Sequence, residues 1–311
     1  MLKLENVSKT YRTGTFGGKA LQAVNDISFT IKDGEVLSLI GESGSGKSTI
    51  GKMILRLIST TQGHISLDDK DIQEYPDREY YRKVQGIFQD PFSCFNPIFK
   101  ADRVFKIIHE EFYPHVPDQE WQEKTYQTIK SVGLNPEHVV DKYPHQLSGG
   151  QLQRFLIARA LLLDIQFLVA DEIISMLDAS TRIDVLNLLA ELKARGLSIL
   201  FITHDLSLAN YISERAIILY RGCAAEIGDI DSVFVEPLHP YTQMLIASVP
   251  RLDQEWDREA TTVEQCLTDM ASTPGCVYAD RCPYVFDFCK VAPPMQEVKP
   301  GHLVSCWKYQ N

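Results

Sequence analysis

A glycine-rich loop between an apolar segment and a helix-like segment constrains this chain more than any other feature. Val36 to Ile40 form a nearly continuous apolar run, and residues 47–58, at the other end of the loop, have the helical spacing of apolar side chains. The loop reads Gly41-Glu42-Ser43-Gly44-Ser45-Gly46-Lys47-Ser48, which fits the G-x-x-x-x-G-K-[ST] pattern in the context that this pattern requires. We therefore predict a strand, a phosphate-binding loop and a helix, as in a parallel α/β fold.

The residues of this loop are suited to binding the phosphates of a nucleotide. Its glycines let backbone N–H groups turn towards the β- and γ-phosphates, and the N-terminus of the following helix adds a favourable dipole. Lys47 supplies a cation, and the hydroxyl of Ser48 can bind Mg²⁺. A Gly/Ser-rich turn without a ligand is the alternative, and the complete motif after a strand argues against it. The predicted ATP-binding residues of the loop are Gly41, Ser43, Gly44, Ser45, Gly46, Lys47, Ser48 and Thr49.

A second apolar segment ends in two acidic residues. Phe167 to Ala170 have the length and composition of a buried strand, and Asp171 and Glu172 follow directly. Such a pair alone is more often a solvated strand end than a catalytic pair. In a chain that also carries a phosphate loop, it favours Asp171 as a Mg²⁺ ligand and Glu172 as the group that orients or activates an attacking water.

The remaining patterns predict an α/β fold with an antiparallel β element and a helical insertion. Alternation of apolar and polar residues indicates half-buried strands near the N-terminus, and a continuous apolar run indicates a further buried strand. Helical spacing recurs in the middle of the chain. The expected strands are 2–7, 23–31 and 198–203, and the expected helices are 121–132, 151–162 and 181–195.

Composition limits the classes of function that the chain can have. It has 311 residues, a net charge of −10 and only short apolar runs, which disfavours both a membrane span and a general nucleic-acid binder. Residues 1–6 lack the charged and apolar regions of a secretory signal, so a cytosolic position is expected. Partners must therefore be inferred from local sites.

A second glycine pair lies between the phosphate loop and the acidic pair, in Leu147-Ser148-Gly149-Gly150-Gln151. At a helix start, Ser148 and the two glycines form a backbone site for an anion, although a simple helix cap would have the same sequence. In this order the motifs resemble those of ATP-binding cassette (ABC) ATPases. The resemblance implies a second ABC ATPase subunit, a paralogue in a heterodimer, whose bound ATP is contacted by Leu147, Ser148, Gly149, Gly150 and Gln151.

The same resemblance assigns roles to four further residues. Tyr11 matches the aromatic side chain on which adenine stacks, and Gln89 matches the glutamine that approaches Mg²⁺ and the attacking water. Asp178 matches a loop that communicates between paired subunits, and His204 matches the histidine that contacts the γ-phosphate. The implied catalytic residues are Glu172, His204 and Gln89, and the implied Mg²⁺ ligands are Ser48, Gln89 and Asp171.

The chain departs from the family pattern at Ile173, where a proline normally follows the catalytic glutamate. Isoleucine restores a backbone N–H and frees φ. Hydrolysis is still expected, because Glu172 and His204 are both present. A heterodimer with one good and one weak composite ATP site is an alternative, and so is a regulatory cassette that binds ATP with little turnover.

A proline-punctuated segment, Pro237-Leu238-His239-Pro240-Tyr241-Thr242, resembles the C-terminal extension of the oligopeptide/dipeptide/nickel importer subfamily. This implies a chain that powers import of di- and oligopeptides through two transmembrane permease subunits, with an extracytoplasmic substrate-binding protein. It also implies a peripheral position at the cytoplasmic face of the cell membrane. Oligosaccharides or nickel are alternative cargoes. A soluble ABC ATPase acting on DNA or ribosomes is disfavoured, because the chain lacks two fused cassettes and a basic face, so no nucleic-acid partner is expected.

Four cysteines cluster near the C-terminus: Cys276, Cys282, Cys289 and Cys306. Four thiolates suit zinc or an iron–sulfur cluster in a reducing compartment. Their gaps of five, six and sixteen residues lack the C-x₂-C spacing usual for structural zinc. Because the tail also resembles importer ATPases that carry a [4Fe–4S] cluster, we predict such a cluster, with zinc or unliganded thiols as alternatives.

These patterns divide the chain into two parts. Residues 1–235 are expected to form an ABC nucleotide-binding domain, with a helical subdomain at about 92–163. Residues 236–311 are expected to form a small Cys-rich extension. Within it, five acidic residues against one basic residue at 253–264 indicate a solvated connector.

Overall fold

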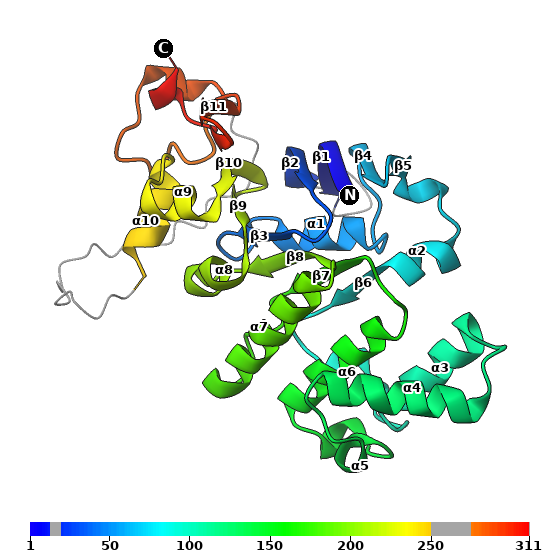
Figure 1. Cartoon of the computed structure of the whole chain (residues 1–311). Coiled ribbons are helices and arrows are strands. Elements are labelled where there is room, and N and C mark those ends of the chain that lie inside the picture. Colours follow the sequence, from blue (N-terminus) through cyan, green and yellow to red (C-terminus); the bar gives the residue numbers. More distant parts are fainter. Residues whose placement is uncertain (13–19, 250–274, 311) are drawn as a thin grey trace.

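Two β-sheets with surrounding helices make up the fold (Figure 1). The computed structural model describes residues 1–12, 20–249 and 275–310, and the predicted connector at 253–264 lies outside these ranges. One sheet has eight strands in the order β11-β12-β10-β9-β3-β8-β7-β6, and the other has four in the order β2-β1-β4-β5. The predicted α/β class is confirmed.

The elements have the following bounds. The strands are β1 (Leu2–Arg12), β2 (Ala20–Ile31), β3 (Val36–Ile40), β4 (Gln62–Leu67), β5 (Lys70–Asp71), β6 (Val84–Ile87), β7 (Phe167–Asp171), β8 (Ser198–Thr203), β9 (Arg215–Tyr220), β10 (Cys223–Asp229), β11 (Gln296–Lys299) and β12 (His302–Val304). The helices are α1 (Lys47–Ile54), α2 (Asp77–Lys83), α3 (Arg103–Phe112), α4 (Asp118–Ser131), α5 (Pro136–Val139), α6 (Gly149–Leu161), α7 (Ala179–Ala194), α8 (Leu206–Ile212), α9 (Ile230–Val235) and α10 (Pro240–Ala247).

Parallel strands form the centre of the larger sheet, because their side chains are mostly apolar on both faces. β3 pairs with β8, and β8 pairs with β7, in parallel, and every residue of these strands is buried. Their carboxyl ends, at Ile40, Asp171 and Thr203, therefore lie at one edge of the sheet. The loops that follow these strands are brought together there, as in other open α/β sheets.

The four-stranded sheet confirms the antiparallel element predicted at the N-terminus. β1 lies between β2 and β4 and pairs with both, so that Leu2 lies opposite Ile31 on one side and Leu67 on the other. Leu2, Leu4 and Val7 are buried against the larger sheet's helix layer, which explains the apolar periodicity of this strand. The sequence patterns did not predict β4 and β5.

The predicted helical insertion is also confirmed, as α3 to α6 (Figure 1). Its core is aromatic: the rings of Phe105 and Phe155 have centroids 4.6 Å apart. The indole Nε1 of Trp121 donates to the carbonyl of Phe105 at 3.1 Å, which ties α4 to α3. Since aromatic side chains bury large apolar areas, these contacts help to pack the insertion, and its core is continuous with that of the larger sheet.

The C-terminal residues extend the larger sheet instead of forming a fully separate unit. β12 pairs antiparallel with β10, with Glu226 opposite Val304, and β11 adds a further antiparallel strand. The physical reason is that β10 would otherwise be an unpaired edge strand. Within the described ranges, none of the helices is both long and apolar enough to cross a membrane.

Candidate nucleotide-binding site

The phosphate loop joins β3 to α1 and is held tightly by its neighbours. Gly46 has a φ of +104°, a left-handed conformation that favours glycine. A Cβ on Gly46 would lie 2.4 Å from the carbonyl oxygen of Ala23, and one on Gly41 would lie 2.1 Å from that of Leu219. The backbones of β2 and β9 therefore approach the loop so closely that these two positions require glycine.

Lys47 is buried at the start of α1 and points back into the loop. Its Nζ donates to the carbonyl oxygens of Gly41 at 2.7 Å and Glu42 at 2.8 Å. Burial lowers the pKa of Lys47, and the carboxylates of Glu172 and Asp171 oppose that shift. The ammonium group thus lies inside the loop, where it can exchange carbonyl partners for phosphate oxygens.

Ser48 and Asp171 meet at the carboxyl edge of the sheet. The hydroxyl of Ser48 donates to Oδ1 of Asp171 at 3.2 Å. Asp171 is the last residue of β7, and burial raises its pKa, while the hydrogen bond from Ser48 works in the opposite direction. Oxygen atoms of a hydroxyl and a buried carboxylate are the ligands that Mg²⁺ prefers, so the donor set fits the predicted metal.

Glu172 and His204 form the second pair of the site. Nδ1 of His204 lies 3.2 Å from Oε1 of Glu172, although the two residues follow different strands. Glu172 has a φ of +50°, and its N–H donates to the carbonyl of Ile202 at 2.9 Å, which fixes the turn after β7. Ile173, which follows Glu172 in place of the family's proline, is 1% exposed, so its side chain is part of the core.

Gln89 and Tyr11 lie at the margins of this group. Gln89 follows β6, which pairs in parallel with β7 and brings Ile87 opposite Ala170, so Gln89 is an exposed residue at the same sheet edge as Asp171. Tyr11 pairs with Leu21 of β2. Leu21 lies two residues before Ala23, whose carbonyl oxygen is next to Gly46 of the phosphate loop. Their predicted roles towards Mg²⁺ and adenine stay predictions.

The second glycine pair and Asp178 both begin helices. Ser148 caps α6 by accepting from the N–H of Gln151 at 3.2 Å, and the Gln151 side chain accepts from the N–H of Ser148 at 2.9 Å. Asp178 caps α7 and accepts from the hydroxyls of Ser180 and Thr181. These hydrogen bonds lower the pKa of Asp178. Capping accounts for the local structure, and the roles of Leu147 to Gln151 and Asp178 towards a second subunit stay predictions.

Two contacts to the phosphate loop were missed by the sequence patterns. The hydroxyl of Tyr241, in α10, accepts from the N–H of Glu42 at 3.0 Å. The guanidinium of Arg281 donates to both carboxylate oxygens of Glu42, at 3.2 and 3.0 Å. Tyr241 and Arg281 lie about two hundred residues further along the chain, so no local motif could have indicated them.

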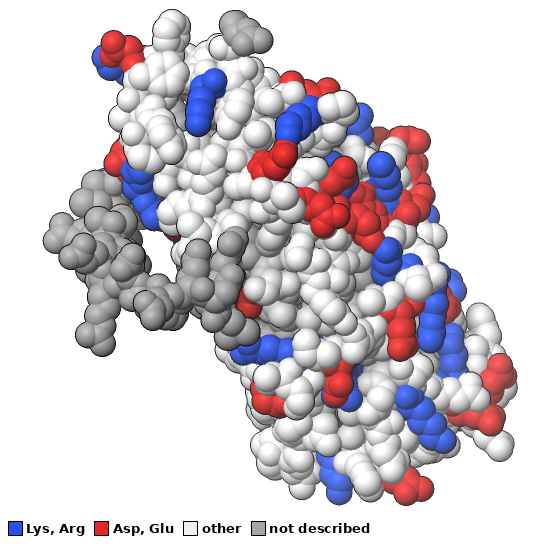
Figure 2. All heavy atoms as spheres, turned by 60° about the vertical axis from the view of Figure 1, so that its left-hand side comes forward, with Lys and Arg blue, Asp and Glu red and all other residues white. Residues whose placement is uncertain are grey.

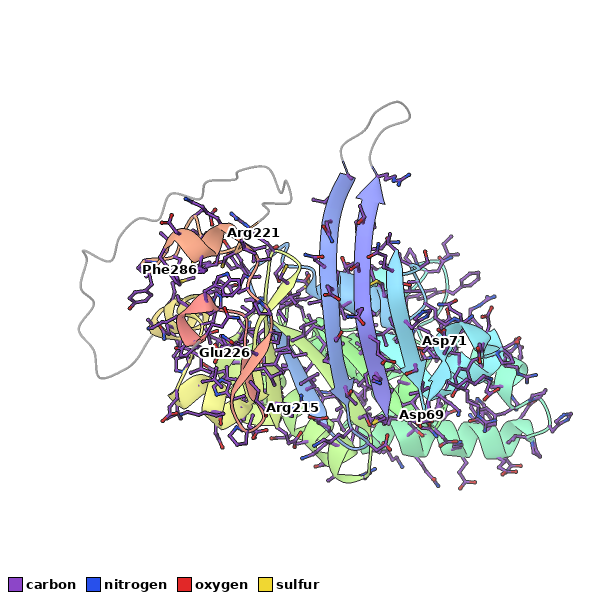
Figure 3. The ribbon with its side chains drawn as sticks, turned by 90° about the horizontal axis from the view of Figure 1, so that it is seen from above. Asp69, Asp71, Arg215, Arg221, Glu226 and Phe286 are labelled. Atoms are coloured by element: carbon purple, nitrogen blue, oxygen red, sulfur yellow. The ribbon has the colours of Figure 1, made fainter. Side chains whose placement is uncertain are left out.

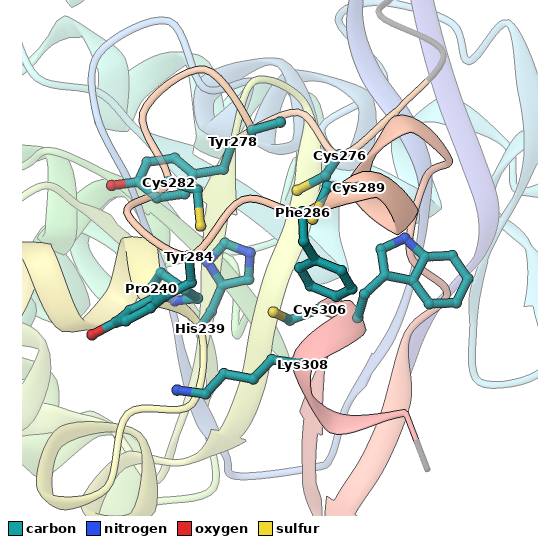
Figure 4. A pocket seen from close by; sticks show the side chains of 12 residues that line it. His239, Pro240, Cys276, Tyr278, Cys282, Tyr284, Phe286, Cys289, Cys306 and Lys308 are labelled. Carbon is teal, nitrogen blue, oxygen red and sulfur yellow. The ribbon is translucent and has the colours of Figure 1, made fainter.

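The four C-terminal cysteines line one cavity, together with His239 and Phe286 (Figure 4). All four are free thiols. Burial raises the pKa of Cys276 to about 11, so without a nearby cation its thiol stays protonated. Among the described residues, no three His, Cys, Asp or Glu side chains are arranged to hold a metal ion. The donors therefore share a cavity but do not adopt a ligating geometry.

Charges on the protein surface are mixed. On the face that Figure 2 shows, Lys and Arg side chains are interspersed with Asp and Glu. A phosphate-bearing ligand there would be recognised by local groups and not by a broad positive field.

Comparisons with known proteins agree with this geometry. Residues 24–175 match the family described as ABC transporter, and residues 225–289 match the oligopeptide/dipeptide transporter C-terminal region. The oligopeptide transport ATP-binding protein AppF of Bacillus subtilis is 40% identical over 324 residues, covering 99% of this chain and 97% of AppF. A protein of Brucella ovis named for ATP binding in peptide import is 38% identical over 314 residues, covering 98% of this chain and 97% of that protein.

Solved structures also resemble the fold. The ATP-binding cassette MJ0796, in a dimer bound to ADP and Pi, is 31% identical with a TM-score of 0.66, covering 74% of this chain and 99% of MJ0796. The protein cbiO1 of Clostridium perfringens, part of the ABC transporter complex cbiONQ, is 26% identical with a TM-score of 0.64, covering 76% of this chain and 90% of cbiO1. This chain belongs to the ATP-hydrolysing, ATP-binding subunits of ABC transporters, in the oligopeptide/dipeptide transporter family.

Proposed function

We propose that this chain hydrolyses ATP to drive import of di- and oligopeptides through separate permease subunits. The observation that carries the proposal is the group of Lys47, Ser48, Asp171, Glu172 and His204 at the carboxyl edge of the sheet. The choice of peptides as cargo is supported by the names of relatives that align along nearly the whole chain.

Each residue of this group has a role that its position supports. Lys47 would bind the β- and γ-phosphate oxygens in place of the loop carbonyls. Ser48 and Asp171, with Gln89, would hold Mg²⁺, which when bound neutralises charge on the phosphates. Glu172 would orient the attacking water and accept its proton, and His204 would contact the γ-phosphate beside it. Tyr11 would stack on adenine.

The segment Leu147 to Gln151, which contains the second glycine pair, and Asp178 are proposed to act on a second ABC ATPase subunit. Ser148 and the backbone of Gly149 and Gly150 would close on the γ-phosphate that the second subunit holds, so that two composite sites form between the cassettes. We place the pair, a heterodimer of paralogues, at the cytoplasmic face of the membrane. It would act on two permease subunits and a substrate-binding protein.

The cysteine cavity is proposed to hold a [4Fe–4S] cluster, for which the four thiols would have to move from their present positions into a ligating geometry. Support comes from the donor chemistry: Cys276, Cys282, Cys289 and Cys306 are four free thiols on one cavity. When bound, the cluster would supply a one-electron centre and four cross-links within the extension. Anaerobic purification followed by visible absorption and analysis for iron, sulfide and zinc tests this, with Cys94→Ser as the control for Cys276→Ser. Zinc without iron would overturn the assignment.

The transport proposal is tested by ATP turnover in nanodiscs that contain this chain and the products of the neighbouring transporter genes. Wild type is compared with Glu172→Gln and with Glu191→Gln, which removes an exposed carboxylate of α7. We expect turnover that peptides and the binding protein stimulate, that Glu172→Gln abolishes and that Glu191→Gln preserves. Stimulation by oligosaccharides or nickel, and not by peptides, would contradict the choice of cargo.

A weak or regulatory ATP site is the second candidate, and Ile173 is the observation that favours it. Its backbone N–H and free φ distinguish this turn from the family pattern, even though its side chain is buried. In that case turnover would come from the partner subunit's site, and Glu172→Gln would leave it unchanged.

A further inference from the structure

Glu42, inside the phosphate loop, is bound by the C-terminal part of the chain at two separate groups. Arg281 donates to both oxygens of its carboxylate, at 3.2 and 3.0 Å, and the hydroxyl of Tyr241 accepts from its N–H at 3.0 Å. The carbonyl of the same residue accepts from Nζ of Lys47 at 2.8 Å. Any movement of the Glu42 backbone therefore moves a hydrogen-bond acceptor of Lys47.

Arg281 is held in place by neighbours that are themselves packed behind the loop. Its guanidinium lies 5.9 Å from the ring centroids of both Tyr220 and Tyr278, which are 3% exposed. The preceding residue, Asp280, pairs at 2.9 Å with Arg221, which is labelled in Figure 3. Arg221 also donates to the carbonyl of Val277 at 3.1 Å.

The turn that contains Arg221 also touches the phosphate loop. The N–H of Gly222 donates to the carbonyl of Ser45 at 2.9 Å. Residues 277–281 are thus fixed to the same turn that supports the loop from behind. This arrangement gives Arg281 a defined position relative to Glu42, which a lone surface arginine would not have.

The charge of Glu42 gives this contact a function. A carboxylate in the phosphate loop repels the phosphates of a nucleotide, and the Glu42 side chain is 41% exposed. Arg281 offsets the charge of that carboxylate with two hydrogen bonds, one to each oxygen. Without the guanidinium, Glu42 would compete with the phosphates for Lys47.

We propose that Arg281 is a positioning residue for ATP binding, which masks the charge of Glu42 and holds the phosphate loop in its binding geometry. The C-terminal extension is then part of the nucleotide site of its own chain. The inference rests on the nucleotide site of the proposed function, but it concerns a residue outside that site's motifs.

The test measures ATP affinity of the full chain, and its steady-state turnover in the nanodisc transporter, as wild type, Arg281→Gln, Glu42→Gln and the double variant. Arg281→Gln should weaken ATP binding by up to about fivefold, the limit expected for a partly exposed ion pair. It should raise KM and leave kcat at saturating ATP unchanged. Glu42→Gln in the same chain should restore the affinity to within about twofold of wild type, because no carboxylate is left to mask.

Two controls separate masking of charge from general damage. Arg281→Lys keeps a cation and should retain most of the affinity. Lys299→Gln removes a cation of the same extension that pairs with Glu236, and should leave ATP binding unchanged. A double variant as weak as Arg281→Gln, or an Arg281→Gln variant that binds ATP like wild type, would overturn the inference. A wild-type chain that fails to bind ATP would instead overturn the proposed nucleotide site.

Discussion

Replacing Glu226 with alanine is the perturbation whose cost the structure defines best. Glu226 lies on β10 and is 0% exposed. Its Oε1 accepts from the N–H of Leu238 at 2.9 Å and contacts Nε2 of His302 at 2.7 Å, and its Oε2 accepts from the N–H of His239 at 2.8 Å. One carboxylate thus joins the larger sheet, the start of α10 and the C-terminal hairpin (Figure 3).

The free-energy cost follows from what the substitution leaves behind. Removing a buried carboxylate that contacts three polar groups costs about 3–5 kcal/mol, mainly because those groups stay buried without an acceptor. The two orphaned backbone N–H groups contribute to the same loss and are not added to it. We expect Glu226→Ala to lower the free energy of unfolding by about 3–5 kcal/mol. Glu226→Gln, which keeps the shape and one acceptor, should cost about 2 kcal/mol.

Urea denaturation of the full chain measures the global cost, and hydrogen exchange locates it. Faster exchange is expected first in β12 and at the start of α10, because Glu226 holds both. Glu236→Gln is the control, since Glu236 is an exposed residue that pairs with Lys299 at the surface and makes none of the buried hydrogen bonds of Glu226. A loss below about 1 kcal/mol in Glu226→Ala, with unchanged exchange in β12, would refute the reasoning.

Three further predictions concern the loop, a buried histidine and the helical subdomain. Gly46→Ala should abolish ATP binding in equilibrium titrations, because the added Cβ would collide with the carbonyl oxygen of Ala23. The control is Gly196→Ala, at a similar φ of +98° with open space around it, which should bind ATP normally. Equal binding by both variants would contradict this reasoning. Burial lowers the pKa of His239 from 6.5 to about 4. The unfolded state therefore binds more protons between those pH values, and stability should fall by about 2 kcal/mol from pH 7 to pH 5. Urea midpoints of chelator-treated wild type and His239→Asn check this, and an equally steep fall in the variant would exclude His239 as the source. Trp121→Ala should lower the free energy of unfolding by about 3–5 kcal/mol in thermal or urea unfolding, since it leaves a cavity between α3 and α4. A loss below about 1 kcal/mol would show that the surrounding side chains fill this cavity.

The sequence predicts the central part of the fold because local pattern and tertiary context agree there. Val36 to Ile40 and Phe167 to Asp171 form strands at the predicted residues, since strands buried on both faces are continuous apolar runs. The helix expected at 47–58 ends earlier, at Ile54, because the chain turns two residues later, at Arg56, which has a positive φ. The periodicity of apolar residues does not indicate the residue at which a helix ends.

Long-range contacts are what the patterns could not reveal. The strand His302–Val304 is short and weakly patterned, and it is a strand only because β10 lies beside it. Likewise, the loop motif identifies Lys47 and Ser48, but neither it nor the proline-punctuated segment that contains Tyr241 indicates that Tyr241 and Arg281 contact Glu42. Side chains that act through distant pairing leave no periodic signal.

The pairing of β12 with β10 has a consequence for how the chain is made. Residues 302–304 are synthesised after the phosphate loop at 41–48, yet they complete the sheet that carries this loop. Until they emerge, β10 has one open edge and the carboxylate of Glu226 lacks its His302 partner. This sheet of the nascent chain therefore stays incomplete until residues 302–304 have emerged, and a chain that stops short of β12 would leave the ribosome with an unpaired strand edge that can pair with other strands.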